Sequence, residues 1–130
     1  MIKKVIFAVC LVFSFYCCGQ NPGFTSFTPA EFEKLLESDA SIQLVDVRRS
    51  VEYDSAHIYN AIVIDVLDSA FIDNATAMLD KTKPVAVYCR SGKRSKDAAG
   101  KLSKSGYKVY ELDSGYLGWA EFKKKLTIDN

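Results

Sequence analysis

One cysteine in this chain stands in a setting that favours nucleophilic chemistry. Cys89 directly follows the apolar run 85–88 and precedes a helical pattern that begins at Lys93. This order places the thiol at the end of a strand, inside a loop whose backbone N–H groups can converge on it. Positive potential from the loop cations and from the start of the helix favours the thiolate near neutral pH. We therefore expect Cys89 to act as a nucleophile.

Two cations follow the cysteine at a position where a helix does not favour them. Lys93 and Arg94 lie in the first turn of the predicted helix, next to the positive end of the helix dipole. Their presence there favours a role in anion binding over the alternative of a solvated helix start. Arg90 lies earlier in the loop, where pointing to solvent and binding an anion are equally compatible with the sequence.

Strand and helix patterns alternate along the rest of the chain. Apolar runs predict strands over 42–47, 61–64, 85–88 and 108–112, and helical patterns cover 28–38, 67–79, 93–103 and 116–126. This alternation predicts an α/β domain with a mainly parallel sheet covered by helices on both faces. Sites in such sheets gather at the carboxyl ends of the strands. Asp46 and Cys89 both fall at such ends, so we expect them to be neighbours.

Composition limits the architecture and the classes of partner. The chain has 130 residues, of which 48% are hydrophobic and 25% charged, and this balance suits one globular domain. The net charge is +1 and no long basic block is present, so nucleic acid is not an expected partner. Cys89 is the only cysteine after residue 18, which excludes an intramolecular disulfide framework or a cysteine-rich zinc site in the folded part. We expect no metal and no cofactor.

The N-terminal segment has the pattern of an export signal. Lys3 and Lys4 precede the uncharged apolar run 5–16, which is shorter than the ~20 residues of a typical membrane-spanning helix. The stretch 15–19 loosely resembles the cleavage site of bacterial lipoproteins, in which a cysteine receives lipid. Cys18 is then the expected lipidated residue. Cys17 is small enough to stand directly before the cleavage site, whereas Tyr16, which would precede a cut before Cys17, is not.

These features divide the chain into a signal peptide at 1–18, a linker at 19–27 and a folded domain at 28–130. Within the linker, the composition of residues 21–27 also suits a short edge strand. We expect an exported, periplasmic or cell-envelope protein that a lipid on Cys18 anchors to the membrane. A plain cleaved signal and an uncleaved anchor are the alternatives.

Several motifs, in a fixed order, resemble one known family. They are Leu44-Val45-Asp46-Val47-Arg48, Glu52-Tyr53, His57-Ile58, Ala61-Ile62, Cys89-Arg90-Ser91-Gly92-Lys93-Arg94-Ser95, Gly106-Tyr107, Gly115 and Trp119. Over residues 25–125 the chain looks like a single-domain rhodanese. It departs from the family pattern in three turns outside the loop, at Ala56, at Tyr59-Asn60 and at Ser114, and these departures concern local backbone shape.

The resemblance implies a rhodanese-like three-layer domain and a sulfurtransferase activity. Cys89 would take a sulfane sulfur from a small anionic donor such as thiosulfate and become a persulfide. It would then pass the sulfur to cyanide or a thiol, including a thiol on a partner protein. The residues expected to bind the donor, through their N–H groups and charges, are Arg90, Ser91, Gly92, Lys93, Arg94 and Ser95.

His57, the only histidine, is predicted to be structural, and Asp46 and Arg48 are predicted to support the loop from beneath.

A phosphatase-like or arsenate-reducing enzyme on a related loop is one alternative function. Such loops carry five residues between cysteine and arginine, whereas four residues separate Cys89 from Arg94 in this chain. A non-catalytic module that binds a partner is the other alternative, and the full set of loop cations argues against it.

Overall fold

The computed structural model describes residues 23–128, which form a single parallel sheet with helices on both faces. The strands are β1 (Phe24–Phe27), β2 (Gln43–Asp46), β3 (Ile62–Val63), β4 (Val85–Tyr88) and β5 (Val109–Leu112). Their order across the sheet is β1-β5-β4-β2-β3, and every neighbouring pair is parallel. The predicted α/β class with a mainly parallel sheet is therefore confirmed.

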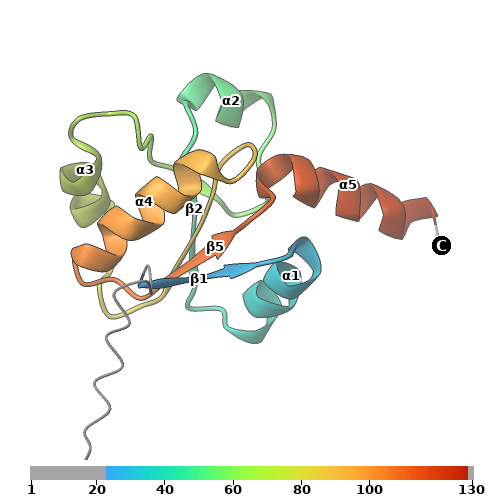
Figure 1. Cartoon of the computed structure of the whole chain (residues 1–130), viewed down its shortest axis with the longest axis horizontal. Helices are drawn as coiled ribbons and strands as arrows, with labels where there is room; N and C mark the ends of the chain where they lie inside the picture. Colours follow the sequence, from blue (N-terminus) through green and yellow to red (C-terminus); the bar gives the residue numbers. More distant parts are fainter. Residues whose placement is uncertain (1–22, 129–130) are drawn as a thin grey trace, which may run out of the picture.

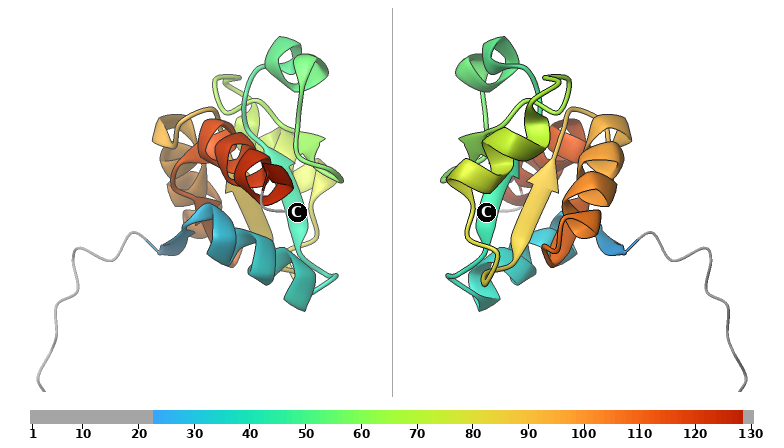
Figure 2. Two further views of the ribbon diagram at one scale, coloured as in Figure 1. Left: turned by 90° about the vertical axis from the view of Figure 1, so that its right-hand side faces the viewer. Right: turned by 90° about the vertical axis from the view of Figure 1, so that its left-hand side faces the viewer.

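Five helices complete the three layers. They are α1 (Pro29–Ser38), α2 (Ser50–Ser55), α3 (Phe71–Met78), α4 (Lys93–Lys104) and α5 (Gly115–Ile128). Helices α3 and α4 cover one face of the sheet, and α1 and α5 cover the other (Figure 1). The short helix α2 lies beyond the end of the sheet towards which the strands point (Figure 2). Helix α2 thus lies at the carboxyl ends of the strands, where Cys89 follows β4.

The central strand β4 explains why both faces must be covered. Its four side chains are all fully buried, with Val85 and Val87 on the face of α4 and Ala86 and Tyr88 on the opposite face. Successive side chains of a strand point to opposite faces, so an apolar run of this kind needs a core on each side. Burying each large apolar side chain contributes about 1.5–3 kcal/mol. The run therefore determines the middle of the sheet.

The predicted helix starts and inward faces agree with the structure where local chemistry determines them. The hydroxyl of Thr28 accepts a hydrogen bond from the N–H of Glu31 at the start of α1. In α4, Ala98, Ala99 and Leu102 are fully buried as predicted. The small side chains of Ala98 and Ala99 let the helix lie close to β4 and β5.

Residues 24–27 lie in the stretch predicted to be a linker or a short edge strand, and they form the edge strand β1, which pairs with β5. Two segments differ from the predictions. Helix α3 begins at Phe71 rather than at residue 67. Helix α2 was not predicted at all, because its six residues carry no apolar stripe and its first turn is closed by side-chain contacts of Glu52. Asn60 adopts a left-handed conformation with φ 68°, which asparagine tolerates, so this departure from the family pattern keeps the turn.

The predicted signal peptide and the lipidation site Cys18 lie outside the described residues. Within residues 23–128, none of the helices is both long enough and apolar enough to cross a membrane.

Candidate active site

The thiol of Cys89 lies at the carboxyl end of β4, where the sequence predicted it. The side chain is almost completely buried, with 1% of its surface exposed. The N–H of Gly92 donates to Sγ at 3.1 Å, and Sγ lies 3.4 Å from Oγ of Ser95. The loop therefore folds around the sulfur atom and surrounds it with hydrogen-bonding groups.

Helix α5 orients this loop from behind. The N–H of Tyr116 donates to the carbonyl of Cys89 at 2.8 Å, and the N–H of Leu117 donates to the carbonyl of Arg90 at 3.1 Å. Because C=O and the following N–H point to opposite sides of a peptide plane, fixing these carbonyls against α5 turns the N–H groups of the loop the other way. The first turn of α5 thus helps to preset the donors around Sγ.

Two glycines allow the loop and the turn before α5 to approach each other. Gly92 has φ 107°, and a Cβ at this position would overlap the carbonyl oxygen of Asp113. Gly115 has φ 65°, and a Cβ there would overlap the carbonyl of Arg90. Both positions combine a backbone conformation that favours glycine with a contact that leaves no room for a side chain. The close packing of these two backbone segments holds the loop in place.

The contacts of the loop with Sγ favour the thiolate form of Cys89. Burial by itself raises the pKa of the thiol, because it disfavours the charged form. The hydrogen bonds of the Ser95 hydroxyl and of the N–H groups of Ser95, Gly92 and Ser91 outweigh burial, so the pKa is lowered from its ordinary value. The site is therefore suited to a buried anionic sulfur.

The loop cation Arg94 is not free. Its two terminal nitrogens bind the two carboxylate oxygens of Glu52 on α2, at 2.7 and 2.9 Å. This pair lowers the pKa of Glu52 to about 2 and, despite some burial, raises the pKa of Arg94, to which the charge of Cys89 also contributes. The guanidinium therefore lies within electrostatic reach of the sulfur but is positioned by α2. Arg90, Ser91 and Lys93 are exposed around the loop, so a direct role of these residues in donor binding stays a prediction.

Asp46 and Arg48 form a buried ion pair beside the loop. Arg48 donates from Nε and from one terminal nitrogen to the Asp46 carboxylate at 2.7–3.0 Å, and the same nitrogen donates to the carbonyl of Ala56 at 2.5 Å. The guanidinium also lies 5.7 Å from the ring centre of Tyr88 and 4.8 Å from that of Tyr116. Asp46 pairs with Tyr88 across β2 and β4, directly before Cys89. The pair therefore connects the elements that flank the loop.

His57 has the position expected of a structural residue. Its ring stacks on Tyr53 with 3.7 Å between ring centres, and Nδ1 contacts the carbonyl oxygen of Tyr53 at 2.8 Å. Tyr53 in turn donates to the carbonyl of Ala61 at 2.7 Å. These contacts shape the turn between α2 and β3, and Cys89 takes no part in them.

Sequence reasoning missed Glu111. This carboxylate is fully buried on β5, accepts a hydrogen bond from Ser95 at 2.6 Å and lies behind Cys89. One signal was available in the sequence. Glu111 lies two positions after Val109 in the same strand, so its side chain must point to the same buried face as Val109. A charged residue on the buried face of a strand indicates a polar partner.

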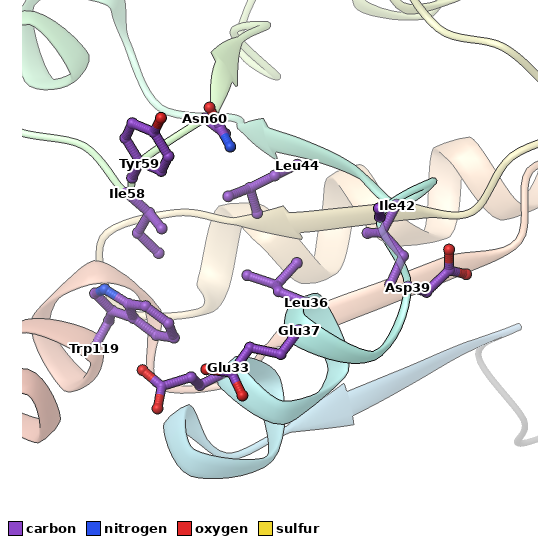
Figure 3. A pocket seen from close by; sticks show the side chains of 11 residues that line it. Glu33, Leu36, Glu37, Asp39, Ile42, Leu44, Ile58, Tyr59, Asn60 and Trp119 are labelled. Carbon is purple, nitrogen blue, oxygen red and sulfur yellow. The ribbon is translucent and has the colours of Figure 1, made fainter.

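Two hollows of the surface lie near these elements. A pocket of about 290 Å³ borders the loop and is lined by Arg48, Val51, Glu52, Ser55, Ala56, Arg90, Tyr116 and Leu117. A larger pocket of about 390 Å³ lies between α1, β2 and α5 (Figure 3), where Leu36, Leu44, Ile58 and Trp119 face one another and acidic side chains stand at the rim. The larger pocket contains none of the loop residues, whereas the smaller one is lined by Arg90, the residue that follows Cys89. Among the described residues, no cluster of three or more histidine, cysteine or acidic side chains could hold a metal ion.

Fold and loop together define a class: a parallel α/β domain that presents a buried, hydrogen-bonded cysteine after a central strand. The model of the rhodanese-like domain family matches residues 28–122, and this chain belongs to that family. The predicted resemblance is thereby confirmed for the domain.

The chain is similar to parts of several known proteins. The probable adenylyltransferase/sulfurtransferase MoeZ of Mycobacterium tuberculosis is 31% identical over 100 residues, which cover 75% of this chain and 25% of MoeZ. The chain thus spans about a quarter of that relative. Thiosulfate sulfurtransferase GlpE of Coxiella burnetii is 37% identical over 79 residues, which cover 60% of this chain and 71% of GlpE. A rhodanese-related protein of Thermoplasma volcanium has a similar structure, with a TM-score of 0.64, 26% identity and coverage of 75% of this chain and 91% of that one.

Proposed function

We propose that this chain is a sulfurtransferase that carries a sulfane sulfur as a persulfide on Cys89. The observation that carries this proposal is the convergence of loop N–H groups and the Ser95 hydroxyl on Sγ, which lowers the pKa of the thiol. The same donors suit the terminal sulfur of a persulfide, because that atom also carries negative charge.

The donor of the proposed reaction is a small anion such as thiosulfate. The Cys89 thiolate attacks the outer sulfur of thiosulfate, a new S–S bond forms, and the bond to sulfite breaks with its electron pair. An acceptor nucleophile, either cyanide or a thiolate, then takes the outer sulfur and regenerates the Cys89 thiolate. The cations Arg90 and Lys93 beside the loop, and the thiosulfate sulfurtransferase among the relatives, support an anionic donor.

The acceptor approaches through the pocket that borders Arg90. Val51 and Leu117 line this pocket and are 62% and 48% exposed, so apolar side chains flank the path to the loop. Exposed apolar side chains at such a place suit a thiol carried by a protein better than a fully hydrated small ion. Both acceptor types remain within the proposal.

A phosphate-transferring enzyme is disfavoured by the state of Arg94. In such an enzyme the arginine of the loop would bind phosphate oxygens, whereas Arg94 already gives both terminal nitrogens to Glu52. The four-residue spacing between Cys89 and Arg94 also leaves less room for a tetrahedral anion.

The test is the mass of the purified protein before and after treatment with thiosulfate. We expect a gain of one sulfur atom that dithiothreitol removes and that maps to the tryptic peptide 82–90, which contains Cys89 and no other cysteine. Cys89→Ser should fold normally and gain no sulfur, because a hydroxyl is a far poorer nucleophile at neutral pH. A Cys89 that alkylates readily but never gains sulfur from thiosulfate would instead indicate a module that binds a partner.

We further propose that the chain is exported and anchored by a lipid on Cys18. This part of the proposal is supported by the basic, apolar and small residues of segment 1–19 alone.

A further inference from the structure

Of the fully buried carboxylates in the described residues, Glu111 has the weaker counter-charge. Asp46, the other fully buried carboxylate of the described residues, is bidentate with Arg48. Within residues 23–128, Glu111 has only Lys96 as a nearby cation, at 3.3 Å, and the Lys96 side chain is about half exposed. A carboxylate without a close buried counter-charge is costly to bury, so its other contacts need an explanation.

Those contacts lead to the sulfur of Cys89. Glu111 pairs with Val87 across β5 and β4, and Cys89 follows two residues after Val87 on the same face. The carboxylate and the thiol are therefore diagonal neighbours, with a gap of one side chain between them. Ser95 fills the gap from α4, with Oγ at 2.6 Å from Oε2 of Glu111 and at 3.4 Å from Sγ.

The Ser95 hydroxyl has one proton and more than one acceptor within reach. Its short distance to Glu111 favours donation to that carboxylate over donation to the carbonyl of Gly92 at 3.1 Å. While Cys89 is a thiol, the hydroxyl proton is turned to Glu111 and the oxygen accepts a hydrogen bond from S–H. Once the sulfur is a thiolate, the hydroxyl of Ser95 donates to it, as its lowering of the pKa requires. The three groups then form a continuous path from the thiol proton to the carboxylate.

We propose that Glu111 is a positioning residue that accepts the thiol proton of Cys89 through Ser95. The S–H bond breaks and its electron pair stays on sulfur, the proton moves to Ser95, and the proton of Ser95 moves to Glu111. The step needs no other reactant and leaves one negative charge on the pair. The thiolate is thus formed without a second negative charge beside it, and the proton returns when the sulfur has been passed on. This role rests on the proposed function of Cys89 as a sulfur carrier.

The path predicts an unusual pH dependence. The ionisable groups around it are Lys96 on α4, Arg94 with its partner Glu52 on the side of α2, and Cys89 itself, whereas β1 contributes only the neutral hydroxyl of Ser26, at 2.7 Å from Oε1. While Cys89 and Glu111 share one proton, the fraction of thiolate does not depend on pH. The reactivity of Cys89 should therefore show two steps separated by a plateau.

The experiment is alkylation of Cys89 in the whole protein with iodoacetamide, followed on peptide 82–90 from pH 5 to 10. This reagent requires no sulfur donor. We expect the wild-type rate to change by less than about threefold across the plateau near neutral pH, and the rate of Glu111→Gln to rise about tenfold per pH unit up to a single step. Ser95→Ala should also lose the plateau, and Ser95→Thr should keep it. Ser26→Ala removes a bond to Glu111 outside the path and should keep the plateau.

A single step of equal slope in the wild type and in Glu111→Gln would overturn the proposal. If Glu111→Gln does not fold, the comparison of Ser95→Ala with Ser95→Thr decides, and equal profiles of these two variants would overturn it as well. Sulfur loading from thiosulfate is measured separately. A plateau without sulfur loading would refute the proposed function and leave the proton path standing. Sulfur loading without a plateau would refute the proton path and leave the proposed function standing.

Discussion

The ion pair between Glu52 and Arg94 should stabilise the fold in a way that depends on pH. Lowering the pKa of Glu52 from 4.5 to about 2 corresponds to at most about 3.5 kcal/mol at neutral pH, since one pH unit is worth about 1.4 kcal/mol. The two side chains keep 24% and 23% of their surface exposed, and solvent screening reduces the expectation to about 1–2 kcal/mol. Glu52→Gln should lose this amount at pH 7.

The sign follows from the direction of the pKa change. The pKa of Glu52 is lower in the folded than in the unfolded protein, so the stabilisation is complete above about pH 5 and is lost as the pH falls towards 2. Urea denaturation of the wild type and of Glu52→Gln should therefore differ by about 1–2 kcal/mol at pH 7 and by less than half of that at pH 2.5. The lowered pKa values of Asp39 and Asp80 affect both proteins equally and cancel in the difference.

Asp54→Asn is the matched control, because it removes one negative charge from the same helix at an exposed position. We expect it to change stability by less than about 0.5 kcal/mol at either pH. The reasoning is refuted if the difference between wild type and Glu52→Gln is the same at pH 7 and pH 2.5, or if Asp54→Asn reproduces it.

Three further predictions concern the loop, its support and the N-terminal segment. Gly92→Ala should destabilise the protein and slow sulfur loading, because of its φ of 107° and the contact with Asp113, whereas Gly100→Ala in the open middle of α4 should stabilise it by about 0.5–1 kcal/mol in urea denaturation. Arg48→Lys should cost about 3 kcal/mol or more, since an ammonium cannot bind Asp46 bidentately and also reach Ala56, and unaltered urea denaturation would contradict this role. Cys18→Ala should release the protein from membranes or block its processing in cell fractionation and detergent partitioning, and Cys10→Ala should not. A mature chain that begins beyond Cys18 and lacks lipid would show an ordinary secreted protein.

The sequence by itself determined the parts of this protein that depend on local chemistry. The run 85–88 predicted a central strand because all its side chains are apolar, and the order of strand, cysteine and helix placed Cys89 in its loop. Thr28 and Pro29 marked the start of α1, because helix capping involves residues only a few positions apart. The order of several motifs between Leu44 and Trp119 also indicated the family.

Only the tertiary structure decided which side chains complete the site. Arg94 and Glu52 are 42 positions apart, and their pairing depends on where α2 stands above the sheet, so the sequence suggested a free cation where the structure has an ion pair. Glu111 reaches Ser95 because β5 lies beside β4 in one register and α4 crosses above them. Helix α2 itself has no apolar stripe and is held by the contacts of Glu52 with Arg94 and of Tyr53 with Ala61. Such contacts form only when distant segments are packed together, and no local pattern of residues encodes them.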